Sequence, residues 1–522
     1  MIKNFKWLLL VSLTFVACND DETAVVTNSS DGLPLTAGTA DFSKYVSVGN
    51  SLTAGYSDGA LFMEGQKGSY PAILASQFSL VGGGEFTIPF TNDNIGGLLL
   101  GGNVIQGPRL YFNGSGPVPV SGTPTTEITN ILTGAFNNMG VPGAKSFHLL
   151  APGYGNVAGV ITGQANPYFV RFASSPTATI LGDATAQNAT FFSLWIGNND
   201  VLSYATSGGI GTNQIGNFDP ATYGGNDITD PNVFTAVYNA LLDNTTGLTK
   251  NGAKGVVANI PYVTSVPFFT TVPTNPIPGL PAASAGQLNQ LFGAINQITT
   301  AIGQPNRFAT LISDDGNPAT VEKNPLLIVD ESLPNLSAFI TNALTPVLGA
   351  PTATFLGNLY GRARHARATV GDRDYILLTA RTVIGTNQTG APSPFNVVGV
   401  SFPMQDNTTL TADETLQVKT ATDSYNTTIQ SLATEKGLAF VDANAILSQV
   451  ANGGISGNNY TLSANYVTGG AFSLDGVHPS PRGYALIANK FIQAINAAYG
   501  SNLKGVNLGN YRILFPQDPA NF

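Results

Sequence analysis

Cysteine and charge are both scarce in this sequence of 522 residues, and each shortage narrows what the chain can be. With a single cysteine, no disulfide can form within the chain. Charged residues make up 10% of the chain and the formal net charge is -9, so the basic surface that nucleic-acid binding requires is missing. We therefore exclude nucleic acid as a partner and a disulfide framework as the basis of the fold.

Sequence motifs for cofactors and metals are missing as well. The chain contains no phosphate-binding Gly-x-x-x-x-Gly-Lys-Ser/Thr loop, no His-Glu-x-x-His pair and no EF-hand loop. We expect neither a cofactor nor a metal.

The abundant residues favour a large folded core with many loops. Hydrophobic residues make up 43% of the chain and aromatic residues 9%, which is typical of a folded protein rather than a disordered one. The 59 glycines and 32 prolines indicate a loop-rich structure. One large domain or two ordinary domains fit this length.

The N-terminus carries a targeting signal. Lys3 and Lys6 precede an apolar run, Trp7 to Val16, that is too short to span a bilayer and is typical of a cleaved signal peptide. The only cysteine, Cys18, directly follows Phe-Val-Ala and so resembles the lipobox in which the cysteine is lipidated. The alternative is an ordinary signal peptide with an incidental cysteine.

Residues 1–18 are therefore predicted to be a lipoprotein signal whose Cys18 anchors the chain to a membrane. Residues 19–40 are polar, lack apolar periodicity and are predicted to be a flexible tether. The run Asn-Asp-Asp-Glu at 19–22 resembles the export tag of surface lipoproteins in the Bacteroidota, although a short acidic run also fits a solvated linker. The expected location is the cell envelope, at the outer membrane or exposed on the cell surface.

The remaining residues, 41–522, alternate short apolar runs with helical patterns. Buried strands are predicted at Tyr45–Val48, Ala189–Ile196, Gly255–Ile260 and Leu438–Val441. Helices are predicted over 288–302 from apolar spacings of 3 and 4, from Thr411 through a capping box with Glu414, and from Ser480 to about Tyr499. This alternation predicts an α/β fold, a three-layer sandwich with a mostly parallel central sheet.

Two stretches interrupt this alternation and are predicted to be insertions, near 81–137 and 268–406. The second contains the densest group of basic residues in the chain: Arg362, Arg364, His365, Arg367, Arg373 and Arg381. Such a group is typical of a solvated face. The alternative is a cap that contacts an anionic substrate or a lipid head group.

A serine and an Asp-x-x-His motif supply the groups needed for nucleophilic catalysis. Ser51 follows the first predicted strand in the segment Gly-Asn-Ser-Leu at 49–52, and the carboxyl ends of parallel strands are where such sheets place their sites. Asp475 precedes His478 by three residues, so the carboxylate can orient the imidazole while Nε2 stays free for a serine.

Two further segments supply donors for an oxyanion. Asn199 lies in Gly-Asn-Asn-Asp at 197–200, at the end of the second predicted strand, and its amide is a donor that does not titrate. Gly143 lies in the predicted turn 138–144 and offers a backbone N–H without a side chain. Gly140 and the pair Gly96-Gly97 are alternatives to Gly143.

Together, these four segments resemble the blocks of the SGNH or GDSL hydrolases, namely Gly-Asp-Ser-Leu, a glycine block, Gly-x-Asn-Asp and Asp-x-x-His. The resemblance implies a flavodoxin-like α/β fold and a serine esterase, lipase or acylhydrolase that needs no metal. It also implies that Ser51 is the nucleophile, that Asp475 and His478 complete the triad, and that Ser51, Gly143 and Asn199 form the oxyanion hole. The expected partner is an ester substrate, either a lipid or an acylated glycan.

Two departures from the family and one competing motif keep alternatives open. Asn50 stands where the motif has aspartate, and the segment between Asn199 and Asp475 is long for the family. A surface binding lipoprotein that keeps the fold without turnover is therefore the second hypothesis. Ser57 also lies in a Gly-x-Ser-x-Gly segment, 55–59, but it does not directly follow a strand as the α/β-hydrolase elbow requires.

Overall fold

The computed structural model describes residues 32–518, and a five-stranded sheet with all neighbours parallel lies at its centre. Its strands, in chain order, are β1 (Tyr45–Gly49), β6 (Asn138–Gly140), β7 (Phe191–Trp195), β8 (Lys254–Ala258) and β15 (Ala439–Val441). Their spatial order is β15-β8-β7-β1-β6. The protein is thus a mixed α/β structure with a parallel central sheet, as the sequence predicts.

The four strands predicted from apolar runs all form, with ends shifted by a few residues. The prediction for 138–144 was wrong at its start, because Asn138–Gly140 is the edge strand β6, paired with Ser47 to Gly49, and not part of a turn. Asparagine and glycine have low strand propensity, so the pairing with β1 determines this conformation. The turn occupies the residues that follow, up to Ala144.

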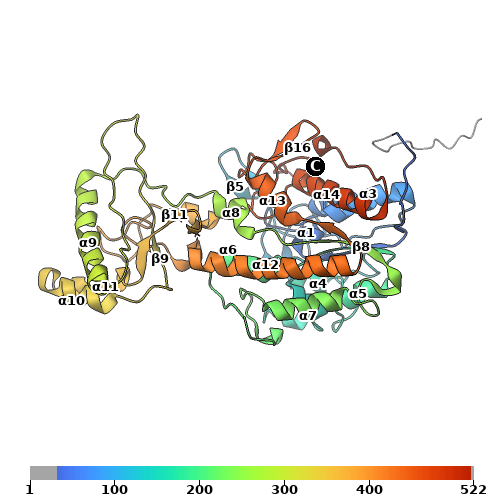
Figure 1. Cartoon of the computed structure of the whole chain (residues 1–522), viewed down its shortest axis with the longest axis horizontal. Coiled ribbons are helices and arrows are strands. Elements are labelled where there is room, and N and C mark those ends of the chain that lie inside the picture. Colours follow the sequence, from blue (N-terminus) through green and yellow to red (C-terminus); the bar gives the residue numbers. More distant parts are fainter. Residues whose placement is uncertain (1–31, 519–522) are drawn as a thin grey trace, which may run out of the picture.

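Helices cover both faces of the sheet (Figure 1). On one face lie α3 (Tyr70–Phe78) and α14 (Pro481–Tyr499), which pack against each other. On the other lie α5 (Ile180–Ala186), α6 (Asn199–Thr206), α7 (Pro231–Leu241) and α12 (Ala412–Glu435). Every residue of β1 and β7 is buried, which is expected for parallel strands covered on two sides.

The predicted helix starts are confirmed by their caps. Thr411 donates from both N and Oγ1 to Glu414 Oε2, at 2.7 and 2.8 Å, and begins α12. Ser480 Oγ accepts from the N–H of Gly483 at 3.0 Å and begins α14. The periodic segment 288–302 lies in α9 (Ala282–Ala301) up to its C-cap, Ile302, and is part of a separate lobe.

The two stretches predicted as insertions form small additional structures. Residues 82–137 contain two antiparallel pairs, β2 (Leu98–Leu100) with β3 (Asn103–Gln106) and β4 (Leu110–Phe112) with β5 (Pro117–Pro119). Residues 272–406 extend away from the sheet (Figure 1). We call this second region the lobe; besides α9 it contains α10 (Ser337–Leu348), α11 (Ala350–Tyr360) and the pair β9 (Leu327–Val329) with β10 (Ala363–His365).

The lobe has apolar clusters of its own, distinct from the cluster around the central sheet. Phe292, Phe308 and Tyr360 pack together in one of them, with the rings of Phe292 and Phe308 stacked at 4.6 Å. The basic group predicted as a solvated face or a cap is partly inside this lobe, because Arg364 and His365 are buried. Arg362 and Arg381 are exposed.

The predicted lipidation residue, Cys18, and the signal peptide lie outside the described residues. Within the predicted tether, the stretch from Pro34 to Ala40 packs along the end of α14; Thr39 N donates to Tyr499 O at 2.8 Å, and Ala40 is buried. Among residues 32–518, no helix combines the length and the apolar character needed to cross a bilayer.

Candidate active site

Ser51 begins the short helix α1 (Ser51–Ala54), directly after β1. The side chain of Asn50 caps this helix, since its Oδ1 accepts from Leu52 N at 3.0 Å. Gly49 allows α1 and β7 to approach closely, because a Cβ at this position would lie 2.2 Å from Thr53 Oγ1 and 2.4 Å from the carbonyl oxygen of Trp195. As the first helical residue, Ser51 has a backbone N–H without a partner inside the helix.

His478 and Asp475 reach Ser51 from the loop that precedes α14. His478 Nε2 lies 2.8 Å from Ser51 Oγ, and its Nδ1 lies 2.9 Å from Asp475 Oδ2. The two side chains of the pair are about 14% and 15% exposed. The three groups predicted as nucleophile, base and orienting carboxylate thus form one chain of hydrogen bonds.

The carboxylate of Asp475 is held in its charged form. Burial alone raises its pKa, but the charge of His478 and the hydrogen bonds from the His478 side chain and N–H and from Val477 N–H outweigh burial and hold the pKa at about 2. Oδ1 accepts from the backbone N–H groups of Val477 and His478, each at 2.8 Å, and from Ser473 Oγ at 3.1 Å. An ionised Asp475 keeps the proton of the imidazole on Nδ1, which leaves Nε2 as an acceptor.

The loop 56–59, which follows α1, braces this carboxylate. Gly59 N donates to Asp475 Oδ2 at 3.0 Å, and the ring of Tyr56 packs on the His478 ring at 4.6 Å. Asp58 Oδ1 accepts from Leu474 N at 2.8 Å, and burial raises the pKa of Asp58 to about 7. No sequence pattern indicates this role, because the partners are more than four hundred residues apart.

Ser57, the competing nucleophile, is part of the same brace. It is 1% exposed, and its Oγ donates to the carbonyl oxygen of Pro479 at 3.1 Å. His478 Nε2 is engaged by Ser51 instead. The structure therefore brings the base to Ser51 and leaves the Ser57 hydroxyl bound to backbone.

Asn199 lies beside Ser51 at the start of α6. In chain order, β1 and β7 are the first and third strands of the sheet, and they are neighbours in space. The strand order reverses between them, and Ser51 and Asn199 follow these two strands at that point. Asn199 Nδ2 donates to Ala144 O at 2.9 Å. An amide nitrogen carries two hydrogens, so one of them is available to an oxyanion.

The turn that carries Gly143 is fixed to α6. Asp200 accepts from Ser146 N at 2.8 Å and from Ser146 Oγ at 2.6 Å, and Asn199 holds Ala144 in the same turn. Gly143 adopts φ +82, a conformation that favours glycine. Gly143 does not line the pocket described below. Of its alternatives, Gly140 is engaged, because its N–H donates to Asn138 Oδ1 at 2.9 Å.

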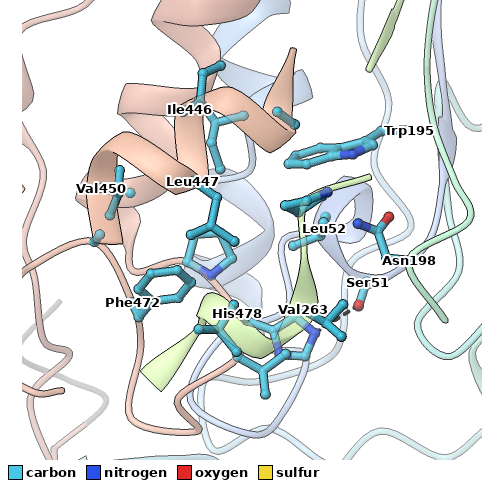
Figure 2. A pocket seen from close by; sticks show the side chains of 18 of the residues that line it. Ser51, Leu52, Trp195, Asn198, Val263, Ile446, Leu447, Val450, Phe472 and His478 are labelled. Atoms are coloured by element: carbon cyan, nitrogen blue, oxygen red, sulfur yellow. Dashed lines mark hydrogen bonds between the residues drawn. The ribbon is translucent and has the colours of Figure 1, made fainter. Parts of the chain in front are cut away.

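An apolar pocket with a cavity volume of about 110 Å³, partly open to solvent, adjoins Ser51 (Figure 2). Its polar lining residues include Ser51, Asn198, Asn199 and His478, while most of its wall is aliphatic or aromatic. Asn198 Oδ1 accepts from Asn50 Nδ2 at 3.1 Å. An ionised aspartate at position 50 could not make this bond, because a carboxylate has no hydrogen to donate to Asn198 Oδ1.

The other two histidines have structural partners elsewhere. His148 Nδ1 accepts from Lys145 N at 3.0 Å, and burial together with the Lys145 charge lowers the pKa of His148 to about 3. His365 Nδ1 accepts from Ala309 N at 2.9 Å, and burial lowers the pKa of His365 to about 4. Both rings are therefore neutral near pH 7, and neither contacts Ser51.

Groups of carboxylates that could hold a cation lie away from the pocket. In the described part of the chain they are Asp314 with Asp315 and Glu322, and Glu331 with Asp406 and Glu414. None of these residues lines the pocket at Ser51.

No family model, curated protein or solved structure matches this chain. Function therefore has to be inferred from the geometry of the site itself.

Proposed function

We propose that the protein is a serine ester hydrolase of the SGNH type that works through an acyl-enzyme. The observation that carries the proposal is the chain of hydrogen bonds from Ser51 Oγ through His478 to Asp475, at one end of an apolar pocket. The strand order, which in chain numbering is 2-1-3-4-5, is that of flavodoxin-like sheets and supports the same family.

The reaction follows from the positions of these groups. Ser51 Oγ attacks the ester carbonyl carbon while its proton moves to His478 Nε2. The protonated imidazole then gives this proton to the leaving alcohol as the C–O bond breaks. Water, deprotonated by the same Nε2, attacks the acyl carbon, and the acid leaves as the C–Oγ bond breaks and His478 returns the proton to Ser51 Oγ.

Stabilisation of the tetrahedral intermediate falls to the donors beside Ser51. The amide of Asn199 and the backbone N–H of Ser51, which line the pocket, are assigned to the oxyanion. The N–H of Gly143 is added as a third donor on the family resemblance alone. Asp475 stays ionised throughout and stabilises the imidazolium that forms when His478 takes the proton.

The alternative, a binding lipoprotein without turnover, rests on the asparagine at position 50. Because Asn50 caps α1 and bonds Asn198 without displacing Ser51, this substitution leaves the distance between Ser51 and His478 at 2.8 Å. The geometry therefore favours the enzyme.

Anchoring to the outer membrane through Cys18 is proposed from the sequence motif alone.

Hydrolysis of p-nitrophenyl esters tests the proposal. We expect Ser51→Ala to lower the rate by about 10⁴-fold or more, because the nucleophile is lost. Ser57→Ala should have a far smaller effect, since that hydroxyl only braces the loop. An inactive wild type that is folded, or a Ser57→Ala variant as inactive as Ser51→Ala, would contradict it.

A further inference from the structure

Much of the wall of the pocket beside Ser51 comes from elements that carry none of the catalytic groups. These elements are β15, α13 (Ala443–Ala451), α14 and the segment 261–266 that follows β8. The apolar residues of these walls include Val263, Val266, Val441, Ile446, Leu447, Val450, Leu486, Ile487 and Phe491. The segments that carry Ser51, Asn199 and His478 add Leu52, Leu202, Phe472 and Val477 to the lining.

The reactive groups lie at one end of this space. In Figure 2, Ser51 and His478 lie together at one side of the pocket, and Ile446 and Val450 lie on the opposite side. Leu447 points inward between them. A molecule bound covalently to Ser51 Oγ therefore has an apolar space directly beside its carbonyl carbon.

The pocket continues toward a shallow surface depression between α13 and α14. Val441, Ile446 and Lys490 line both cavities, and the depression is otherwise lined by three polar residues, Asp442, Gln449 and Gln493, and three apolar ones, Phe440, Ala445 and Ala494. Lys490 is half-buried, which fits a side chain that covers apolar surface with its stem while its ammonium group stays in water. The apolar wall that begins beside the nucleophile thus ends next to a surface depression with a mixed polar and apolar lining.

We propose that this pocket holds the acyl chain of the substrate, and that the substrate class is esters of long linear fatty acids rather than acetyl esters. The inference rests on the proposed function. An acetyl group would leave the apolar walls uncovered, whereas each methylene of a longer chain removes apolar surface from water. A polar sugar would lose hydrogen bonds to water against walls that offer almost no replacements.

The order of the reaction steps favours binding of the acyl group, rather than the alcohol, in this pocket. The alcohol leaves first, and water must then reach the acyl carbon beside His478 Nε2. The acyl group stays in place through both steps. A largely apolar cavity suits the group that stays, while the alcohol needs a route to solvent from the side of His478.

Two ester series distinguish the acyl chain from the alcohol. In the first, the acyl chain grows from acetate to palmitate on p-nitrophenol; in the second, acetate is kept and the alcohol grows from methanol to dodecanol. We expect kcat/KM to rise by up to about fourfold for each added methylene in the acyl series until the pocket is full. The alcohol series should change far less. A steeper rise with the alcohol, or acetate as the best acyl group, would overturn the assignment.

A pocket variant and a surface control locate the effect. Leu447→Trp fills the space between Ser51 and Val450 and should lower the ratio of the kcat/KM for palmitate to that for acetate by tenfold or more. Val450→Phe narrows the same wall with less added bulk and is used if Leu447→Trp does not fold. Leu416 is 61% exposed on α12, so Leu416→Trp should leave the ratio unchanged. An unchanged ratio in both folded pocket variants would overturn the inference.

Failure of the inference and failure of the proposed function give different results. If acetate is hydrolysed in a manner that depends on Ser51 but the rate is insensitive to chain length, only the acyl-chain assignment is wrong. If no ester in either series is hydrolysed and Ser51 does not react with a fluorophosphonate, the proposed function itself is wrong.

Discussion

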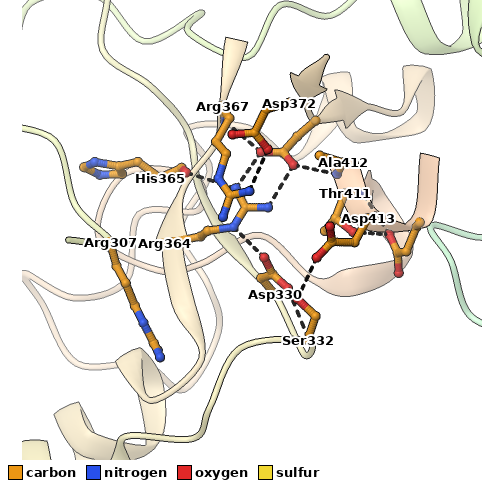
Figure 3. A network of polar contacts seen from close by, with 12 residues as sticks. Arg307, Asp330, Ser332, Arg364, His365, Arg367, Asp372, Thr411, Ala412 and Asp413 are labelled. Atoms are coloured by element: carbon orange, nitrogen blue, oxygen red, sulfur yellow. Dashed lines mark hydrogen bonds and ion pairs between the residues drawn. The ribbon is translucent and has the colours of Figure 1, made fainter. Parts of the chain in front are cut away.

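The protein contains two networks of charged and polar side chains, one beside the central sheet and one in the lobe. Their hydrogen bonds are similar, but their roles differ. Beside the central sheet, Asp475, His478 and Ser51 form a chain of hydrogen bonds that ends at a pocket. In the lobe, Arg364 Nε donates to Asp330 Oδ2 at 2.5 Å, and its two terminal nitrogens donate to Asp374 at 2.5 and 2.8 Å (Figure 3).

The two networks differ in the exposure of their side chains and in the basic residue that pairs with the carboxylates. The side chains of Arg364, Asp330 and Asp374 are 0–3% exposed, whereas His478 and Asp475 are about 14% and 15% exposed. Two buried carboxylates raise the pKa of Arg364, although burial alone would lower it, so its charge is permanent. An imidazole, in contrast, can take and return a proton near neutral pH. The first network is suited to chemistry and the second to holding structure.

The network in the lobe also connects the lobe to the part of the chain around the central sheet. Asp374 Oδ1 accepts from Ala412 N at 3.0 Å, and Ala412 is the first residue of α12, which packs over the central sheet. The sequence suggested a solvated or ligand-binding basic group here. Arg364 instead has its donors satisfied within the protein.

The largest expected contrast comes from replacing one carboxylate in each network. Asp475→Asn should lower kcat/KM by about 10⁴-fold, because an amide favours the wrong tautomer of His478, with little change in stability. Asp374→Asn should leave kcat/KM unchanged but lower the free energy of unfolding by about 3 kcal/mol, because a buried guanidinium loses a charged partner. Ester hydrolysis and urea unfolding measure the two effects. Equal effects of both variants on kcat/KM would remove the distinction between the networks.

A second contrast compares two buried asparagines. Asn199→Ala should lower kcat by about 10²- to 10³-fold, as expected for the loss of an oxyanion donor. Asn324 in the lobe uses its amide to hold the backbone oxygens of Pro278 and Ile312, at 3.0 and 2.9 Å. Asn324→Ala should therefore lower the melting temperature without changing kcat. A normal kcat in a folded Asn199→Ala variant would remove Asn199 from the oxyanion hole.

The brace around Asp475 predicts a pH effect on stability. Because burial raises the pKa of Asp58 to about 7, above its value near 4 in the unfolded chain, the folded protein binds an extra proton between these pH values. The contribution of Asp58 to the free energy of unfolding is thus fully present below pH 4 and is lost as the pH rises through 7. This loss is on the order of 4 kcal/mol. Asp58→Asn should flatten this dependence in urea unfolding measured from pH 4 to 8. Parallel curves for the two proteins would contradict the assignment.

The smallest effect is expected at the position that departs from the family motif. Asn50→Asp keeps an acceptor for Leu52 N, and a rotated Asn198 amide can donate to the new carboxylate. We expect kcat/KM to change by less than about tenfold, because Ser51 Oγ keeps its contact with His478. A gain of a thousandfold or more in the same ester assay would indicate that the asparagine had suppressed turnover, as the binding hypothesis requires.

The parts of the structure that depend on local sequence could be predicted. Apolar runs identified four strands, and short motifs identified the helix starts at Thr411 and Ser480. The Asp-x-x-His spacing brings Asp475 to His478 within one turn, so this contact too is local.

The parts that depend on distant pairing could not be predicted. Strand β6 has no strand-like residues and exists because it pairs with β1. Gly59 and Asp475 are 416 residues apart, and nothing in a glycine indicates that its N–H will donate to a distant carboxylate. Burial of Arg364 likewise depends on Asp330 and Asp374 meeting it in three dimensions.

The central claim is that His478 activates Ser51 and no other serine. Trypsin cleavage after Lys44 and Lys67 releases a peptide that contains Ser47, Ser51 and Ser57, and fragmentation in a mass spectrometer distinguishes the three. After reaction of the folded protein with a fluorophosphonate, the account predicts one adduct, on Ser51, and its loss in His478→Ala. An adduct on Ser57, or labelling of Ser51 that is unaffected by His478→Ala, would contradict it.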